Sequence, residues 1–368
     1  MGEWSYRASD SRSTRRRQYV SALLALFTAV SAVTAQWMPL DCAKFGHTGG
    51  PCSCAVHDRT PNNRSRHQVW ITCVNVTSLE QLNRILAPAR YHRVDKFQLG
   101  VSRLGHLPSN LFLDVRVSEV HVWDTPLASF VQGDSDDALL GLQDTLRSMG
   151  HLRTLEMLDL SFNQLTTVRA LWFRAQLSGS LRSLLLRGNR IARIESGAFA
   201  KLYRLLQLDL SRNNIAAIER SMLPDRLFFL DLSDNRLSVL SPLLFDKMTS
   251  LRRVYLNGNR LTTLDRVVWS AVWSNPRLGV EIHGNPVVCD QRLCWLARLV
   301  PRECHSRDCQ RSPADYRQLD GRCNSPPPMA GRHLAHVDCD SLACGAACDE
   351  APGHAGDDYH ANELSPFW

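Results

Sequence analysis

The chain has 368 residues, of which 44% are hydrophobic and 21% charged, so it can bury a sizeable core and is not an intrinsically disordered chain. Basic residues exceed acidic ones by 43 to 36, but only four of the 43 are lysines, so the charge reflects a composition bias and indicates no nucleic-acid partner. The 12 cysteines lie in two groups, four between positions 42 and 73 and eight between 289 and 348. Such clustering at the two ends predicts disulfides formed in an oxidising compartment.

The first 35 residues have the pattern of a secretory signal peptide. Arg15, Arg16 and Arg17 precede an apolar run over 19–35 that ends in small residues, which predicts cleavage before Gln36. Cleavage removes five arginines and two acids, so the formal charge falls from +7 to +4. The 18-residue leader before the run keeps an uncleaved membrane anchor open as an alternative. No later segment is apolar enough to span a bilayer, so we expect a soluble, secreted, extracellular protein.

Two glycosylation sequons agree with export, one at Asn63 and one at Asn75. Both lie in the N-terminal cysteine group. Its four cysteines allow three disulfide connectivities, and the residues alone do not choose among them.

The middle of the chain repeats itself. The pattern LxxLxLxxNxL is intact five times, with asparagine at positions 163, 189, 213, 235 and 259. A degenerate copy follows, with asparagine at 285. Two earlier units carry Ser102 and Thr125 at the asparagine position, which gives eight units spaced 23, 38, 26, 24, 22, 24 and 26 residues apart. The alternation in LxL is that of a strand buried on one face, and an asparagine amide can bond the backbone of adjacent turns. Apolar residues five and ten positions after the asparagine predict a packed outer side.

This pattern resembles the leucine-rich repeat family over about 94–285. The resemblance implies an α/β solenoid: a curved, right-handed coil of about eight repeats with a parallel sheet on its concave face, disulfide-capped at both ends. A single coil cannot bury enough apolar surface to fold alone, so the stack needs a cap at each end. We therefore expect a signal peptide at 1–35, an N-terminal cap at 36–90, repeats at 91–283 with an enlarged, helix-containing coil at 131–153, a C-terminal cap at 284–348 and a disordered tail at 349–368.

The cysteine groups resemble the caps of extracellular leucine-rich repeat proteins. At the N-terminus the resemblance implies the pairs Cys42–Cys54 and Cys52–Cys73. At the other end it implies that Cys289 and Cys294 pair with Cys323 and Cys339, and that a short helix carries Trp295 and Leu296 onto the last coil. Gln291 stands where the family has its second cysteine. Four further cysteines exceed the family's usual eight, and we expect them to form two more bridges: Cys304, Cys309, Cys344 and Cys348.

Metal binding and catalysis are both disfavoured. Four histidines lie among the C-terminal cysteines, at 305, 333, 336 and 354, but the cysteine spacings are looser than those of zinc sites, which favours disulfides. The acidic run over 133–137 fits no calcium loop and reads as a solvated turn. The motifs GxSxG, HExxH, GxGxxG and GxxxxGK[ST] are absent. We therefore predict no enzyme, no cofactor and no metal.

The repeat geometry places the variable strand residues on the concave face. The recurring Leu-Asp-Leu-Ser is the common form of the repeat, so its aspartates are interpreted as structural. Aromatic, arginine and leucine residues depart from that form, and such residues dominate interface hot spots. The predicted partner-binding residues are Trp123, Leu185, Arg187, Phe229, Arg253 and Tyr255. The alternative is that Trp123 and Phe229 cover neighbouring side chains or lie under the insert at 131–150.

Three functions remain open from the sequence. The first is a secreted binding protein that recognises a protein or glycan through its concave face, in adhesion, matrix or recognition roles. The second is the non-catalytic subunit of a secreted enzyme. The stretches 51–54, 71–73, 120–127 and 141–146 are similar to secreted arthropod proteins grouped with the non-catalytic subunit of shrimp luciferase. The third is the ligand-binding part of an innate-immune or developmental receptor.

Overall fold

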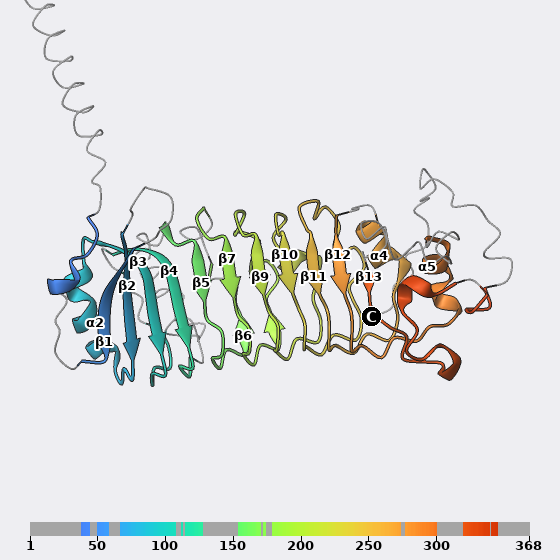
Figure 1. Ribbon diagram of the computed structural model, residues 1–368, viewed down its shortest axis with the longest axis horizontal. Coiled ribbons are helices and arrows are strands. Elements are labelled where there is room, and N and C mark those ends of the chain that lie inside the picture. Colours follow the sequence, from blue (N-terminus) through green and yellow to red (C-terminus); the bar gives the residue numbers. More distant parts are fainter. Residues whose placement is uncertain are drawn as a thin grey trace, which may run out of the picture.

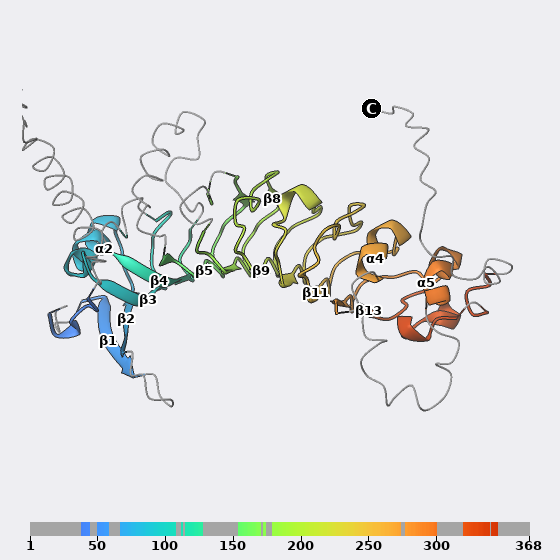
Figure 2. The same ribbon diagram turned by 90° about the horizontal axis from the view of Figure 1, so that it is seen from above.

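The structure is a computed structural model, and it describes residues 38–44, 50–58, 67–107, 112, 115–127, 154–170, 172–173, 179–273, 277–299, 319–338 and 340–344. These residues form one curved solenoid with a single 11-stranded sheet along its length (Figure 1). The strands lie on the inside of the curve, and the connecting segments form the outside (Figure 2). The expected α/β solenoid with a parallel concave sheet is confirmed.

The eight predicted units supply eight consecutive parallel strands. They run in the spatial order β3, β4, β5, β7, β9, β10, β11 and β12, with β2 before them and β13 after them. The strand bounds are β2 His67–Val74, β3 Arg93–Gly100, β4 Arg116–Trp123, β5 Met157–Asp159, β7 Ser183–Leu185, β9 Gln207–Asp209, β10 Phe229–Asp231, β11 Arg253–Tyr255, β12 Gly279–Glu281 and β13 Leu319–Asp320. In each coil the middle strand residue points inward, and this column from Leu158 to Val280 is at most 1% exposed.

The asparagine positions form a buried ladder, as the repeat pattern predicts. The amide of Asn213 donates to the carbonyl oxygens of Leu186 in the preceding coil and of Leu210 in its own, each at 3.0 Å. Its Oδ1 accepts from the backbone N–H of Ile191 at 2.9 Å. Ser102 and Thr125 place hydroxyl groups at this position. Ser102 Oγ accepts from Val76 N at 3.1 Å. One polar column therefore links each coil to the next.

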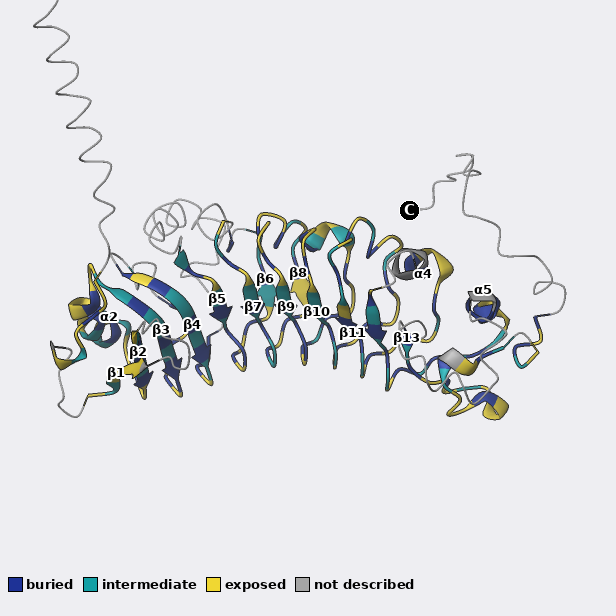
Figure 3. Ribbon diagram, turned by 45° about the horizontal axis from the view of Figure 1, so that its top comes forward, coloured by how far each residue is buried: buried dark blue, intermediate teal, exposed yellow. Residues whose placement is uncertain are grey.

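The convex side is filled by the residues predicted five and ten positions after the asparagines. Phe173 and Phe199 stack with ring centroids 5.8 Å apart, and Phe245 lies 6.2 Å from Trp269. Exposed positions gather in the turns that connect the two sides (Figure 3). The regular elements on this side are β6 Thr167–Val168, β8 Arg193–Ile194, η5 Arg220–Met222 and α4 Arg266–Trp273.

The N-terminal cap has the predicted disulfides, Cys42–Cys54 and Cys52–Cys73. Strand β1, Cys52–Asp58, pairs antiparallel with β2, which in turn starts the parallel stack. Helix α2, Leu79–Leu86, begins at Ser78, whose Oγ accepts from Gln81 N, and it buries Leu82 and Leu86 against the first coil. Short 3-10 helices η1, Cys42–Lys44, and η2, Ala87–Ala89, complete the cap. Its strands and helix thus cover the open end of the core.

The C-terminal cap corrects one predicted disulfide. Cys289 pairs with Cys323 as expected, but Cys294 pairs with Cys344 and not with Cys339. The reason is the position of the last described segment, which contacts the cap. Gln291 Nε2 donates to the Ala343 carbonyl at 3.2 Å, and Cys344 lies next to it, with its Cα 5.8 Å from that of Cys294. Cys344, assigned to the extra bridges, therefore belongs to the cap itself.

The tryptophan in this cap lies where the resemblance implied. Helix α5, Cys294–Leu299, places the Trp295 indole so that its Nε1 donates to the Leu264 carbonyl at 3.1 Å, while Leu296 is buried. The remaining elements are η6 Gln291–Leu293, η9 Pro327–Met329 and η10 Leu334–His336.

Several predictions concern parts of the chain outside the described residues. They are the signal peptide at 1–35, the sequon at Asn63, the enlarged coil at 131–153, the tail at 349–368 and cysteines 304, 309, 339 and 348. Among the described residues, no helix is both long and apolar enough to cross a membrane. Asn75, the other sequon, is exposed at the end of β2.

Candidate binding surface

Strand register sorts the solvent-facing side chains of the concave sheet into columns. One column holds Met157, Ser183, Gln207, Phe229 and Arg253, and the next holds Asp159, Leu185, Asp209, Asp231 and Tyr255. Most of these side chains are half-buried, and Arg253 is exposed. Because the core lies on the other face of each strand, the fold does not require apolar side chains here.

The structure brings three of the six predicted binding residues together. The Phe229 and Tyr255 rings come from neighbouring strands, with centroids 5.3 Å apart and planes 46° apart. Arg253 lies beside Phe229 in the register, and its guanidinium extends over Gly279, where an added Cβ would come within 2.8 Å of Nη1. These three residues, Phe229, Arg253 and Tyr255, are called the aromatic cluster below.

The other three predicted residues lie apart from this cluster. Leu185 and Arg187 belong to the β7 coil, two strands away, with β9 between. Trp123 ends β4 and lies over Gly100 on the neighbouring strand, where a Cβ would meet the indole at 2.5 Å. The absence of a side chain at position 100 makes room for this indole.

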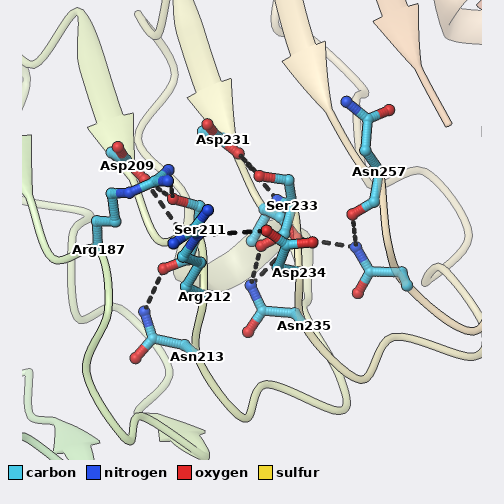
Figure 4. Close-up of polar contacts among 12 residues, drawn as sticks. Arg187, Asp209, Ser211, Arg212, Asn213, Asp231, Ser233, Asp234, Asn235 and Asn257 are labelled. Atoms are coloured by element: carbon cyan, nitrogen blue, oxygen red, sulfur yellow. Dashed lines mark hydrogen bonds and ion pairs between the residues drawn. The ribbon is translucent and has the colours of Figure 1, made fainter. Parts of the chain in front are cut away.

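The repeated aspartates bond within their own turns. Asp209 Oδ1 accepts from the backbone N–H and the hydroxyl of Ser211, and Asp231 does the same with Ser233 (Figure 4). Arg187 Nη1 donates to the Ser211 hydroxyl at 2.8 Å. Burial raises the pKa of Asp231, and the negative charge of Asp209 adds to this effect, although the Ser233 bonds and Arg187 oppose it. These contacts support the structural interpretation of the aspartates.

A charged group at the N-terminal end of the face was not singled out from the sequence. Lys96 lies 4.8 Å from the centroid of the Trp70 ring and 3.3 Å from a Glu119 carboxylate oxygen. His121 lies between Glu119 and Asp159, at 3.4 Å from each. Burial alone would raise the pKa of Asp159, but hydrogen bonds from His121 and Ser161 outweigh it and hold the pKa below its usual value. The alternation of core-facing and solvent-facing residues along β2 would have revealed this group, because it places Trp70 beside Lys96 in the strand register.

A second group joins the last full coil to the C-terminal cap. Asp320 on β13 accepts from Nε2 of His283 at 2.9 Å and from Nε2 of His333 at 2.7 Å. Burial acts to raise the pKa of Asp320, but the hydrogen bonds from His333 and His283 outweigh it, so the pKa lies below its usual value. Within the described residues no three histidine, cysteine or acidic side chains are placed to hold a metal ion.

The lowered pKa gives Asp320 a defined effect on acid stability. The carboxylate stabilises the folded chain above about pH 4, the usual range of an aspartate, and this stabilisation is lost as the pH falls through the lowered value. We therefore expect Asp320→Asn to lower the Tm at pH 6, with the difference from wild type shrinking steadily towards pH 2. Thermal unfolding followed by circular dichroism measures this. Asp340→Asn, an exposed aspartate of the same cap, is the control, and a difference that widens in acid contradicts the prediction.

Comparison with known proteins identifies leucine-rich repeats within residues 179–267. Residues 179–225 match the family model "Leucine rich repeat", and residues 225–267 match "Leucine Rich repeats (2 copies)". Human leucine-rich repeats and immunoglobulin-like domains protein 3 is 33% identical over 118 residues, which cover 32% of this chain and 10% of that protein. Human fibromodulin is 30% identical over 172 residues, which cover 43% of each. The matched part thus spans less than half of either relative.

The fold agrees with a solved structure. The crystal structure of human trophoblast glycoprotein superposes with a TM-score of 0.53 and 20% identity, over 74% of this chain and 93% of that one. At this identity the likeness concerns the fold alone. Taken with the asparagine ladder, the concave parallel sheet and the matches over residues 179–267, it shows leucine-rich repeats in a solenoid with disulfide-bonded ends.

Proposed function

We propose that this chain is a secreted binding protein that recognises a protein or glycan partner through its concave face, in an adhesion, matrix or recognition role. The observation that carries the proposal is the aromatic cluster. Two aromatic rings and an arginine stand on the solvent-facing side of a sheet whose core lies behind it. Aromatic and arginine side chains are the residues that most often dominate interface energies. Similarity to other leucine-rich repeat proteins and four disulfides among the described cysteines support an extracellular binding role.

The proposal includes no catalytic step. Glu119, His121 and Asp159 on the face are bonded to one another, and Asp231 is bonded to Ser233 in its own turn. The two other functions, a non-catalytic subunit of a secreted enzyme and the ligand-binding part of a receptor, rest on the sequence and stay predictions.

Partner capture tests the concave face. The full chain, immobilised, is exposed to extracellular medium from its source, and the captured partner is identified by mass spectrometry and then measured by titration. We expect the double variant Phe229→Ala, Tyr255→Ala to weaken binding about 30-fold or more, the effect of removing an interface hot spot of about 2 kcal/mol.

The control is Val239→Ala, which removes a side chain that is 67% exposed and lies on the convex side, in the position that β8 occupies two coils earlier. Both variants are checked for an unchanged circular dichroism spectrum. A folded double variant that captures the same partner with wild-type affinity removes the aromatic cluster from the site.

A further inference from the structure

A row of side chains runs along the edge of the sheet where the strands begin. The residue immediately before each of three strands donates its backbone N–H to the preceding coil: Leu206 N to Arg182 O, Phe228 N to Leu206 O and Arg252 N to Phe228 O, at 2.8 to 2.9 Å. Five residues therefore form one continuous line across neighbouring coils, in the order Glu156, Arg182, Leu206, Phe228 and Arg252. We call this line the amino-end rim.

The middle of the rim is apolar and open to solvent. Leu206 is 41% exposed and Phe228 is 51% exposed, and they are neighbours in the row. Glu156, Arg182 and Arg252 occupy the same position in other coils, so the repeat does not need an apolar residue there. Adjacent exposed apolar side chains rimmed by charge are the pattern of a protein interaction site.

Arginines surround this apolar centre. Arg182 and Arg252 flank it in the row, and Arg204 and Arg226, each two residues earlier in the chain, are exposed beside it. The Arg252 guanidinium lies 5.9 Å from the centroid of the Phe228 ring and donates to the Thr249 and Leu251 carbonyls. Among the described residues, none of the ion pairs involves Arg182, Arg204 or Arg226. Within the part of the chain that the structure describes, the charge around the apolar centre is therefore positive and not neutralised.

The rim is continuous with the aromatic cluster. Phe228 and Phe229 are consecutive, so one faces the rim and the other the concave sheet, and Arg252 and Arg253 repeat this arrangement on the next coil. A partner seated on Phe229 and Tyr255 therefore has Phe228, Leu206 and the arginines within reach at the edge of the same surface.

Resting on the function proposed above, we infer that the partner is a protein whose contacting segment carries acidic side chains around one or two apolar ones, and that it binds across the rim as well as the concave face. Acidic groups are required because the arginines attract a segment that carries carboxylates and repel one that carries basic side chains. Apolar groups are required because burying Leu206 and Phe228 lowers the free energy only when apolar surface of the partner replaces water around them. A sulfated polysaccharide does not offer such a surface.

A defined probe tests this chemistry. A random dodecapeptide library displayed on phage is selected on the full chain in 0.15 M NaCl, and the most enriched peptide is synthesised and titrated by fluorescence anisotropy. The expected peptides combine Asp or Glu with Leu, Phe, Tyr or Trp. Phe228→Ala weakens the peptide about 30-fold and Arg204→Glu with Arg226→Glu at least tenfold, with affinity falling as salt is raised.

The control makes the same charge change elsewhere. Arg193→Glu with Arg236→Glu reverses two exposed arginines away from the rim and leaves peptide binding within twofold of wild type. Peptides that require Phe229 and Tyr255 but are unaffected by the rim variants overturn this inference and leave the concave-face function standing. Peptides indifferent to both sets of variants, or no enrichment at all, overturn this inference, whereas the concave-face function is overturned only by the capture experiment with Phe229→Ala, Tyr255→Ala. Retention on immobilised heparin that depends on Arg204 and Arg226, without a peptide that needs Phe228, assigns the rim to a polysaccharide and also overturns the inference.

Discussion

Replacing Asn213 by alanine is expected to lower the free energy of unfolding by about 3 kcal/mol. The side chain is buried, and its Oδ1 is the acceptor for the backbone N–H of Ile191. An unsatisfied buried donor costs about 1–3 kcal/mol, and the lost amide also removes one bond each from the carbonyls of Leu186, Leu210 and Ser211. Those carbonyls keep other donors, including Asn189 and Asn235, which limits the loss.

Urea unfolding at equilibrium measures this change. The matched control is Asn214→Ala at the adjacent, half-buried position, which we expect to lie within about 0.5 kcal/mol of wild type because surface-type changes away from buried networks do little. Asn213→Asp separates the donor from the acceptor role, since a carboxylate can accept from Ile191 but meets three carbonyl oxygens. We expect it to be more destabilising than alanine at pH 7. Similar values for the Asn213 and Asn214 alanine variants contradict the ladder's proposed contribution.

Removing the Cys294–Cys344 bridge with the double variant Cys294→Ser, Cys344→Ser is expected to cost about 3 kcal/mol. The bridge spans 50 residues, but Cys289–Cys323 already joins the two segments, so the loop that it closes in the unfolded chain is shorter than 50 residues. The bridge therefore contributes less than its sequence separation suggests.

Two measurements check this prediction. Non-reducing proteolysis with mass spectrometry is expected to yield one linked peptide pair containing Cys294 and Cys344. Urea unfolding compares the double variant with Cys339→Ser, which leaves that linked pair in place. A Cys294–Cys339 linkage in the wild-type digest contradicts the assignment and restores the pairing that the cap resemblance implied.

Regular periodicity made most of the fold predictable. The leucines and asparagines that recur every 22 to 26 residues each have the same environment in every coil. Their burial, the strand on the concave side and the packed convex side therefore follow from the pattern. Thr125 and Ser102 were also recognisable, because a hydroxyl can take part of the asparagine's bonding and does so between successive coils.

The candidate site was only partly predictable, because contacts between coils depend on register and not on spacing alone. The concave phase identified Phe229, Arg253 and Tyr255 as departures from the repeat, and the structure adds that they are neighbours. The concave phase did not identify Leu206 and Phe228, because they precede their strands and lie outside the concave columns. The Asp320 contacts with His283 and His333 could not be predicted for another reason, since Asp320 and His333 lie outside the repeats and have no periodic spacing from His283.

The asparagine ladder also determines how the molecule responds to force. A pull along its long axis loads every coil boundary in series, so extension begins at the boundary with the fewest and longest bonds. Asn213 ties its two coils with one accepted and one donated bond, whereas Thr125 accepts from Ser102 N at 3.4 Å and donates only to Trp123 within its own coil. The ladder is thus weakest near the N-terminal end, where seven residue pairs join β3 to β4, against three between β7 and β9. Resistance to extension therefore rests on strand pairing at that end and more on the ladder in the regular coils that carry the aromatic cluster.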